Sequence, residues 1–154
     1  MADSFTARGG LWVAGQSLLM IGVIALGLLF RGQWHNRASI VVGAGLFVLG
    51  GMMGIAGVRA LGGNRTAYPK PMEGATLVQH GIFGLVRHPL YSSVILVSFA
   101  WGLLWQSGPA LGAAAVLTIF LNRKASREER WLREKYPEYE RYAAQVRRLI
   151  PGIY

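Results

Sequence analysis

Four long segments of this sequence contain no charged side chain, and they limit the fold more than any other feature. They are residues 11–30, 38–58, 89–105 and 109–122. A helix of about 20 apolar residues crosses the hydrocarbon core of a bilayer, which is about 30 Å thick. Charged residues make up only 15% of the chain, whereas a soluble domain has about 25%. The sequence therefore predicts an integral membrane protein.

The predicted fold is a single all-α domain over residues 1–154, a polytopic membrane bundle of about four transmembrane helices. A cleaved signal peptide is the alternative for 11–30, but this segment is longer than a usual signal-peptide core, and no small-residue cleavage site follows Phe30. Pro89 suits a helix start, where its missing N–H has no cost. We therefore expect residues 89–122 to form a tight helical hairpin.

Two polar regions complete the chain, at residues 62–91 and 123–154. The first is rich in proline and glycine, which argues against a continuous helix, and loops of this length are usually functional or disordered. The second is expected to continue the fourth helix, which is short for a span, and to stop at Pro137. A further short helix is predicted near 138–148.

The basic residues predict the orientation in the membrane. Four spans place the N-terminus, the loop and the tail on one side, and this side carries all Lys and Arg residues except Arg31 and Arg37. Basic loops favour the cytoplasm, so both termini are predicted to be cytoplasmic in a multi-pass protein of a bacterial-type inner membrane. The net charge of +9 then favours the anionic bilayer surface as the partner, and no nucleic acid.

Glycine recurs at near-helical spacing in the second apolar segment, at Gly43, Gly50, Gly54 and Gly57. Stripes of small residues let helix backbones approach closely in lipid. A packing face is therefore predicted here, and a cofactor-binding glycine loop is not.

Two clusters of ionisable residues flank the predicted hairpin. One is Arg87-His88-Pro89-Leu90-Tyr91, and the other is Glu128-Glu129. The apolar segments themselves contain no ionisable residue other than tyrosine, which argues against a pump or a proton-coupled exporter. Because the hairpin brings its two ends together, both clusters should meet at the cytoplasmic face.

These residue types fit a ligand with three different groups. A helix N-terminus and the Arg87 guanidinium suit an anionic group. The carboxylates suit ribose hydroxyls or a cationic centre, and Tyr91 offers a ring and a hydroxyl. S-adenosylmethionine has a carboxylate, a ribose and a sulfonium cation.

Each cluster also has a simpler interpretation. Arg87 and His88 alone could anchor the chain at the membrane interface. Glu128 and Glu129 alone could belong to a solvated helix face with pairs four residues apart. The chain has no cysteine, and its His, Asp and Glu spacing does not resemble a metal site, so no metal is predicted.

The sequence resembles the integral membrane methyltransferases that include isoprenylcysteine carboxyl methyltransferase and the phospholipid N-methyltransferases. Their C-terminal half has an Arg-His-Pro-x-Tyr-x-Gly motif, an apolar hairpin and a Glu-Glu pair. Here the motif is at residues 87–93, approached by the run 81–86, and the Glu-Glu pair continues as Glu128-Glu129-Arg130-Trp131-Leu132. The resemblance covers roughly residues 62–154, and it includes the C-terminal run that begins Tyr136-Pro137-Glu138-Tyr139. Ser93 stands where the family usually has glycine.

The resemblance implies methyl transfer from S-adenosylmethionine to a lipophilic acceptor that enters from the bilayer. The acceptors left open are an isoprenylcysteine-like carboxylate, a phospholipid amine and a small thiol or acid. The implied catalytic residues near the acceptor are Arg148 and Tyr142. The implied cofactor-binding residues are Gly81, Arg87, His88, Tyr91, Glu128 and Glu129.

Two other functions remain open from the sequence. One is an NADPH-dependent membrane reductase related to sterol reductases, but no extra basic cluster is available for a 2′-phosphate. The other is a non-enzymatic four-helix membrane subunit or transporter. The oligomeric state is not predicted.

Overall fold

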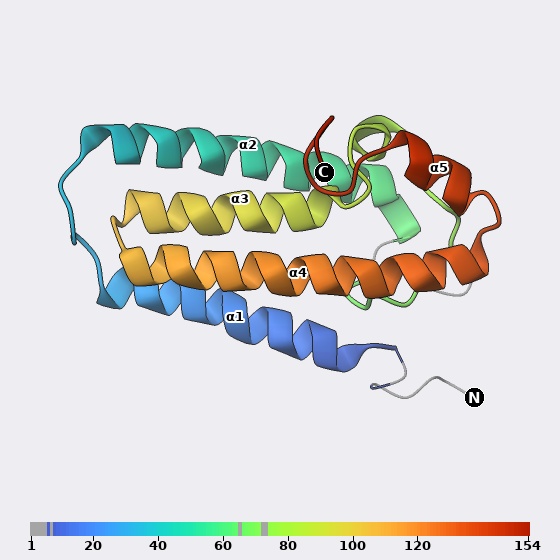
Figure 1. Cartoon of the computed structure of the whole chain (residues 1–154), viewed down its shortest axis with the longest axis horizontal. Helices are drawn as coiled ribbons and strands as arrows, with labels where there is room; N and C mark the ends of the chain where they lie inside the picture. Colours follow the sequence, from blue (N-terminus) through green and yellow to red (C-terminus); the bar gives the residue numbers. More distant parts are fainter. Residues whose placement is uncertain (1–5, 7, 65, 72–73) are drawn as a thin grey trace.

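The computed structural model describes residues 6, 8–64, 66–71 and 74–154. These residues form an all-α structure (Figure 1). Its α-helices are α1 (Gly10–Leu29), α2 (Arg37–Leu61), α3 (Pro89–Leu104), α4 (Gly108–Lys135) and α5 (Tyr139–Gln145). Two short 3₁₀ helices, η1 (Gly62–Asn64) and η2 (Gly81–Gly84), lie between α2 and α3. The predicted helices are confirmed, with ends that differ by a few residues.

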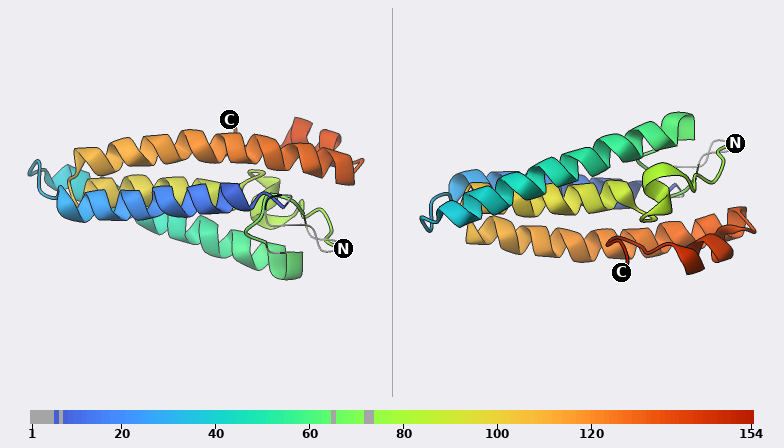
Figure 2. Two further views of the ribbon diagram at one scale, coloured as in Figure 1. Left: turned by 90° about the horizontal axis from the view of Figure 1, so that it is seen from below. Right: turned by 90° about the horizontal axis from the view of Figure 1, so that it is seen from above.

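The long helices pack in pairs around α3 and α4. α2 packs along α3, α1 packs along α4, and α3 and α4 form the predicted antiparallel hairpin. Figure 2 shows that α2 diverges from α4 toward the end of the bundle that holds the 62–88 loop. The bundle is therefore widest at the end where the polar segments gather.

Local signals explain where the helices begin. The side chain of Asn36 accepts a hydrogen bond from the Ala38 N–H at the start of α2, and Ser107 accepts one from the Ala110 N–H at the start of α4. Pro89 lies in the first turn of α3, as predicted. α4 continues without interruption from its apolar half into its charged half and ends before Pro137. This continuity carries Glu128 and Glu129 beyond the apolar part of the bundle.

The glycine stripe of α2 forms the interface with α3, which confirms the predicted packing face. A Cβ atom built on Gly50 would lie 2.9 Å from Val97 Cγ2, and one on Gly54 would lie 2.7 Å from Ser93 Oγ. Ser93 donates a hydrogen bond of 2.6 Å to the Gly50 carbonyl. The serine that replaces the family glycine therefore joins α2 to α3.

Two helices are long and apolar enough to cross a membrane: α1, and α2 together with the η1 turn. α3 is apolar but shorter, with 16 residues. Many large apolar side chains on α1 and α2 are exposed, such as Leu18 at 71% and Val41 at 70%. Such surfaces suit lipid rather than water. Two or three apolar helices of membrane length are thus present.

The two ends of the bundle differ in composition. At one end the 30–36 turn meets the α3–α4 turn, where the Gln33 N–H donates to the Gln106 carbonyl. At the other end lie the start of α1, the 62–88 loop, the charged half of α4, and α5 (Figure 1). The polar segments that the sequence placed on one side of the membrane are therefore together in space.

Candidate active site

The start of α3 and the charged half of α4 meet through Glu129. The Arg87 Nε and Nη2 atoms each lie 3.1 Å from Glu129 Oε1, which confirms that the hairpin brings the two clusters together. The side chain of Glu129 is fully buried. Arg87 Nη1 also donates to the carbonyls of Ala143 and Val146 after α4. Arg87 thus links three parts of the chain.

Two further side chains join this buried network. His88 Nε2 lies 3.1 Å from Glu129 Oε1, and Arg148 Nη2 donates to Glu129 Oε2 at 2.7 Å. Burial alone would raise the pKa of Glu129, but the hydrogen bonds from His88 and Arg148 and the charge of Arg87 outweigh it and hold the pKa well below its ordinary value of 4.5. Glu129 is therefore a buried, ionised carboxylate whose oxygens contact Arg87, His88 and Arg148.

Backbone contacts fix the C-terminal segment beside the motif. The Arg87 and His88 N–H groups donate to the Arg147 and Arg148 carbonyls, and Val86 forms a parallel bridge with Arg147. The Ser92 hydroxyl donates to the Leu149 carbonyl at 2.7 Å. These contacts explain why the tail follows the start of α3 closely.

Glu128 has different surroundings from its neighbour. It accepts a hydrogen bond of 2.6 Å from the Tyr91 hydroxyl and lines two cavities. The Tyr91 ring stacks on the His88 ring, with centroids 5.3 Å apart. Glu128 is thus the member of the pair that faces the cavities.

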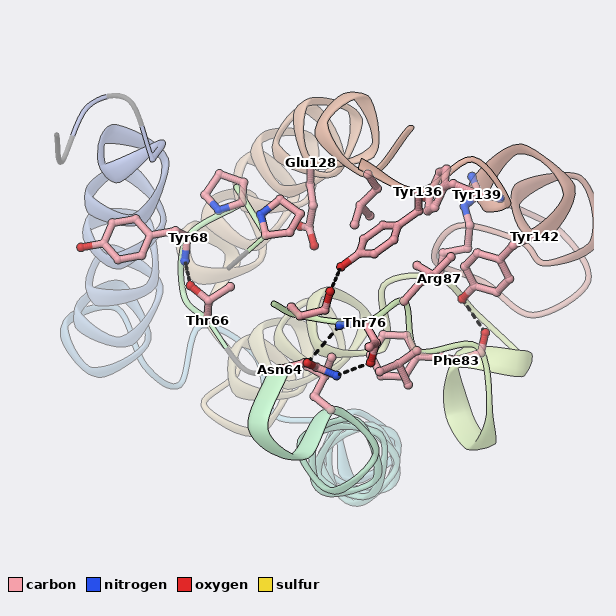
Figure 3. Close-up of a pocket in the computed structure, with 17 residues that line it drawn as sticks. Asn64, Thr66, Tyr68, Thr76, Phe83, Arg87, Glu128, Tyr136, Tyr139 and Tyr142 are labelled. Atoms are coloured by element: carbon pink, nitrogen blue, oxygen red, sulfur yellow. Dashed lines mark hydrogen bonds between the residues drawn. The ribbon is translucent and has the colours of Figure 1, made fainter. Parts of the chain in front are cut away.

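The first cavity lies between α4, α5 and the described residues of the 61–78 segment (Figure 3). Its wall contains the aromatic residues Tyr68, Phe83, Tyr136, Tyr139 and Tyr142. Several of its polar groups are already bonded to the backbone, since the Tyr136 hydroxyl donates to the Ala75 carbonyl and the Tyr142 hydroxyl donates to the Phe83 carbonyl, both at 2.6 Å.

One polar atom in this wall differs from the others. The Tyr139 side chain is buried, and its hydroxyl has no hydrogen-bond partner among the described residues. Burial, with the charges of Glu129 and Glu128, raises the pKa of Tyr139 well above its ordinary value, so the hydroxyl keeps its proton. A buried donor without a partner is costly, and a bound ligand could satisfy it.

The second cavity, of about 420 Å³, adjoins the first. Both are lined by Arg87 and Glu128, and the second extends to His88, Tyr91 and Lys124. Its far wall is the first half of α1.

The third cavity, of about 390 Å³, lies deeper in the apolar part of the bundle. It is lined by residues of α1, α2 and α3, and it shares Met20 and Val94 with the second cavity. Except for two serines, its lining side chains are apolar or aromatic. An apolar cavity between the helices therefore lies next to the cavity that contains Glu128, and Met20 and Val94 form part of the wall of both.

The predicted site residues separate into groups in space. Arg87, His88, Tyr91 and Glu128 line the second cavity, and Tyr142 lines the first. The remaining predicted residues lie outside these cavities: Glu129, Arg148 and Gly81. Gly81 is exposed and begins η2 with a φ of 60°, a conformation that favours glycine. The backbone turn at this position therefore accounts for the glycine. Arg148 lies against Asn122, Ser126 and Glu129.

Lys124 and Gln16 are among the residues of the second cavity that the sequence interpretation missed. Lys124 lies one helical turn before Glu128, and Gln16 is one of two polar side chains in an otherwise apolar helix. Positions four apart share a helix face, so the position of Glu128 could have indicated Lys124. A lone polar residue in an apolar span could have indicated Gln16.

Comparison with known proteins agrees with this geometry. Residues 38–139 match the family model described as phospholipid methyltransferase. The match covers more than half of the chain, from the start of α2 to the start of α5, and includes both clusters. The comparison with curated proteins gives no match. The chain therefore belongs to the phospholipid methyltransferase family and is a membrane methyltransferase that uses S-adenosylmethionine.

Proposed function

We propose that this protein methylates the amine nitrogen of a phospholipid head group at the cytoplasmic end of a four-span bundle. The observation that carries this proposal is that the apolar third cavity lies beside the second cavity, which contains Glu128, with Met20 and Val94 in the walls of both. A lipid with its tail between the helices would have its head group beside Glu128. The family membership decides against the reductase and the non-enzymatic subunit considered from the sequence.

The residues of the first two cavities fit S-adenosylmethionine. Aromatic side chains line the space for an adenine ring, the Tyr139 hydroxyl supplies a buried donor, and Glu128 offers an acceptor for ribose hydroxyls or a counter-charge for the sulfonium. When bound, the cofactor supplies a methyl group already activated by the positive sulfur. Arg87, with Glu129, would shape the wall of the cavity because the contacts of its guanidinium lie mainly within the protein.

An amine acceptor suits Glu128 better than a carboxylate acceptor. A carboxylate attracts an ammonium group and repels the carboxylate of an isoprenylcysteine. Hydrogen bonding to Glu128 would orient the nitrogen, and the ammonium would give one proton to the Glu128 carboxylate. The freed lone pair would then form the bond to the methyl carbon as the bond from this carbon to sulfur breaks and S-adenosylhomocysteine leaves. Tyr91 holds Glu128 in place through its 2.6 Å hydrogen bond.

The proposed orientation follows the basic residues. The end with the 62–88 loop and the tail faces the cytoplasm, and both termini lie on that side. The spans are α1, α2, α3 and the first half of α4, close to 11–30, 38–58, 89–105 and 109–122.

The test measures methyl transfer by the purified protein in lipid nanodiscs. Phosphatidylethanolamine, an isoprenylcysteine and a small lipophilic thiol are each supplied with methyl-labelled S-adenosylmethionine, and the products are identified by mass. We expect N-methylated lipid with the first acceptor. Glu128→Gln should lower kcat/KM strongly, whereas Glu134→Gln, an exposed change on the same helix, should not. Transfer to the carboxylate or the thiol instead of the amine would overturn the proposal.

A further inference from the structure

Lys124 is a buried cation beside the proposed acceptor position. Its side chain lies on α4 and is buried, at 2% exposure for the residue. Its Nζ atom donates to Gln16 Oε1 at 2.6 Å and to the Ala67 carbonyl at 3.4 Å. The same Nζ lies 5.3 Å from the centroid of the Tyr91 ring, and Lys124 lines the second cavity with Glu128. A buried lysine in a cavity wall is costly without a functional or structural partner.

The order of charges along α4 matches the order of charges in an aminophospholipid. Lys124 precedes Glu128 by four residues, which is about 6 Å along the helix axis, on the same face. Because α4 runs from its apolar half to its charged half, Lys124 is nearer to the apolar third cavity than Glu128 is. In an aminophospholipid the phosphodiester is likewise nearer to the acyl chains, and an ethylene linker separates it from the amine.

We propose that Lys124 binds the phosphodiester of the acceptor lipid while Glu128 binds its amine, so that the two residues select a zwitterionic head group in one orientation. This inference rests on the proposed function and adds the residue that recognises the phosphate. An ammonium has three N–H groups, and hydrogen bonds to Gln16 and Ala67 use two of them. The third can turn into the cavity toward a phosphate oxygen.

Two other observations describe the charge and the position of this ammonium. Burial lowers the pKa of Lys124, and the charge of Glu128 partly offsets this effect. A phosphodiester beside the amine would favour its charged form further. The contacts to Gln16 on α1 and Ala67 in the loop also fix the ammonium in the wall of the second cavity.

The test compares lipids that differ only in the phosphate. The Kd and KM of the parent protein are measured for a phosphatidylethanolamine and for a lipid amine of equal chain length without phosphate, with binding followed by calorimetry in detergent. Lys124→Gln keeps a hydrogen-bond donor and removes the charge. We expect it to weaken phosphatidylethanolamine binding by about tenfold to a hundredfold and to leave the Kd of S-adenosylhomocysteine and of the phosphate-free amine within about twofold. Lys124→Arg should restore most of the loss.

The matched control is Arg123→Gln, which removes the same charge from an exposed neighbouring position outside the three cavities. It should bind both lipids like the parent. The inference would be overturned if the parent protein bound the two lipids with equal affinity, a measurement that does not depend on the folding of any variant. It would also be overturned if Lys124→Gln lost affinity equally for both lipids. Weaker S-adenosylhomocysteine binding in Lys124→Gln would assign the lysine to the cofactor carboxylate and would also overturn it. The proposed function fails separately, if the parent protein binds phosphatidylethanolamine but does not methylate it.

Discussion

Glu128 and Glu129 are adjacent in the chain, yet the structure places them in different surroundings. Adjacent helical positions point about 100° apart, so one side chain faces the cavities and the other faces Arg87, His88 and Arg148. The sequence could predict the pair and its meeting with the 87–91 motif. It could not decide which glutamate a ligand reaches, because that depends on how α4 is rotated against α3.

The buried position of Glu129 predicts a dependence of stability on pH. Its pKa is lowered in the folded state from an ordinary value of 4.5. Below about pH 4.5 the unfolded chain therefore binds a proton that the folded protein does not, and the free energy of unfolding falls as the pH falls. Above this pH the stabilisation is complete. Glu129→Gln should be less stable than the parent at pH 7 and should lose less stability on acidification, as measured by thermal unfolding in detergent. Parallel pH curves for the two proteins would contradict this prediction.

The Tyr139 hydroxyl offers a second test at the level of one atom. Because this hydroxyl has no partner among the described residues, Tyr139→Phe should leave the ligand-free protein equally or more stable. If the cofactor satisfies the hydroxyl, the variant should gain less stability from S-adenosylhomocysteine than the parent does. Thermal shift with and without the ligand measures both effects.

Tyr142→Phe is the matched control for this variant. It removes the hydrogen bond to the Phe83 carbonyl, so it should lower the stability of the ligand-free protein by about 1 kcal/mol. An unchanged ligand shift in Tyr139→Phe would place the cofactor away from this hydroxyl.

At the level of the helices, the sequence predicted most of the elements because a helix that crosses a bilayer needs about 20 uncharged, mostly apolar residues. The uncharged segments, the proline at residue 89 and the proline at residue 137 define the helices of the structure to within a few residues. The pairing of residues 86–88 with 147–148 was not predicted. Irregular segments that pair side by side have no periodic pattern, so the sequence gives no signal for them.

The α2–α3 interface gives a prediction with a close control. Gly50 faces α3, where a Cβ atom would lie 2.9 Å from Val97, whereas a Cβ atom on Gly51 meets none of the described atoms within 4 Å. Gly50→Leu should therefore cost about 1–3 kcal/mol through overpacking, and Gly51→Leu should have little effect. The melting temperature of each variant in detergent measures this difference. Equal losses would show that leucine harms α2 itself rather than its packing.

At the level of the whole molecule, the shared position of the polar segments predicts the topology. The start of α1, the 62–88 loop and the tail lie at one end of the bundle. A reporter fused after Tyr154 should therefore give a cytoplasmic signal, and a label attached to a cysteine at His35 should be accessible only from the opposite side. A non-cytoplasmic signal from the Tyr154 fusion would reverse the proposed orientation.

The third cavity allows a test of how the acceptor lipid enters the bundle. Ile24 on α1 and Phe47 on α2 both line it, and α1 and α2 lie on different sides of α3. The chain has no native cysteine, so cysteines at these two positions can be joined selectively by a bifunctional maleimide. Joining the helices should block lateral movement of a lipid tail into the cavity. We expect phosphatidylethanolamine methylation to fall about tenfold or more, equivalent to at least about 1.4 kcal/mol, with little change in the Kd of S-adenosylhomocysteine, since Glu128 and the aromatic wall lie nearer to the polar end. Each single-cysteine variant treated with the same reagent is the control. Full activity in the cross-linked protein would mean that the lipid reaches Glu128 by a route other than the space between α1 and α2.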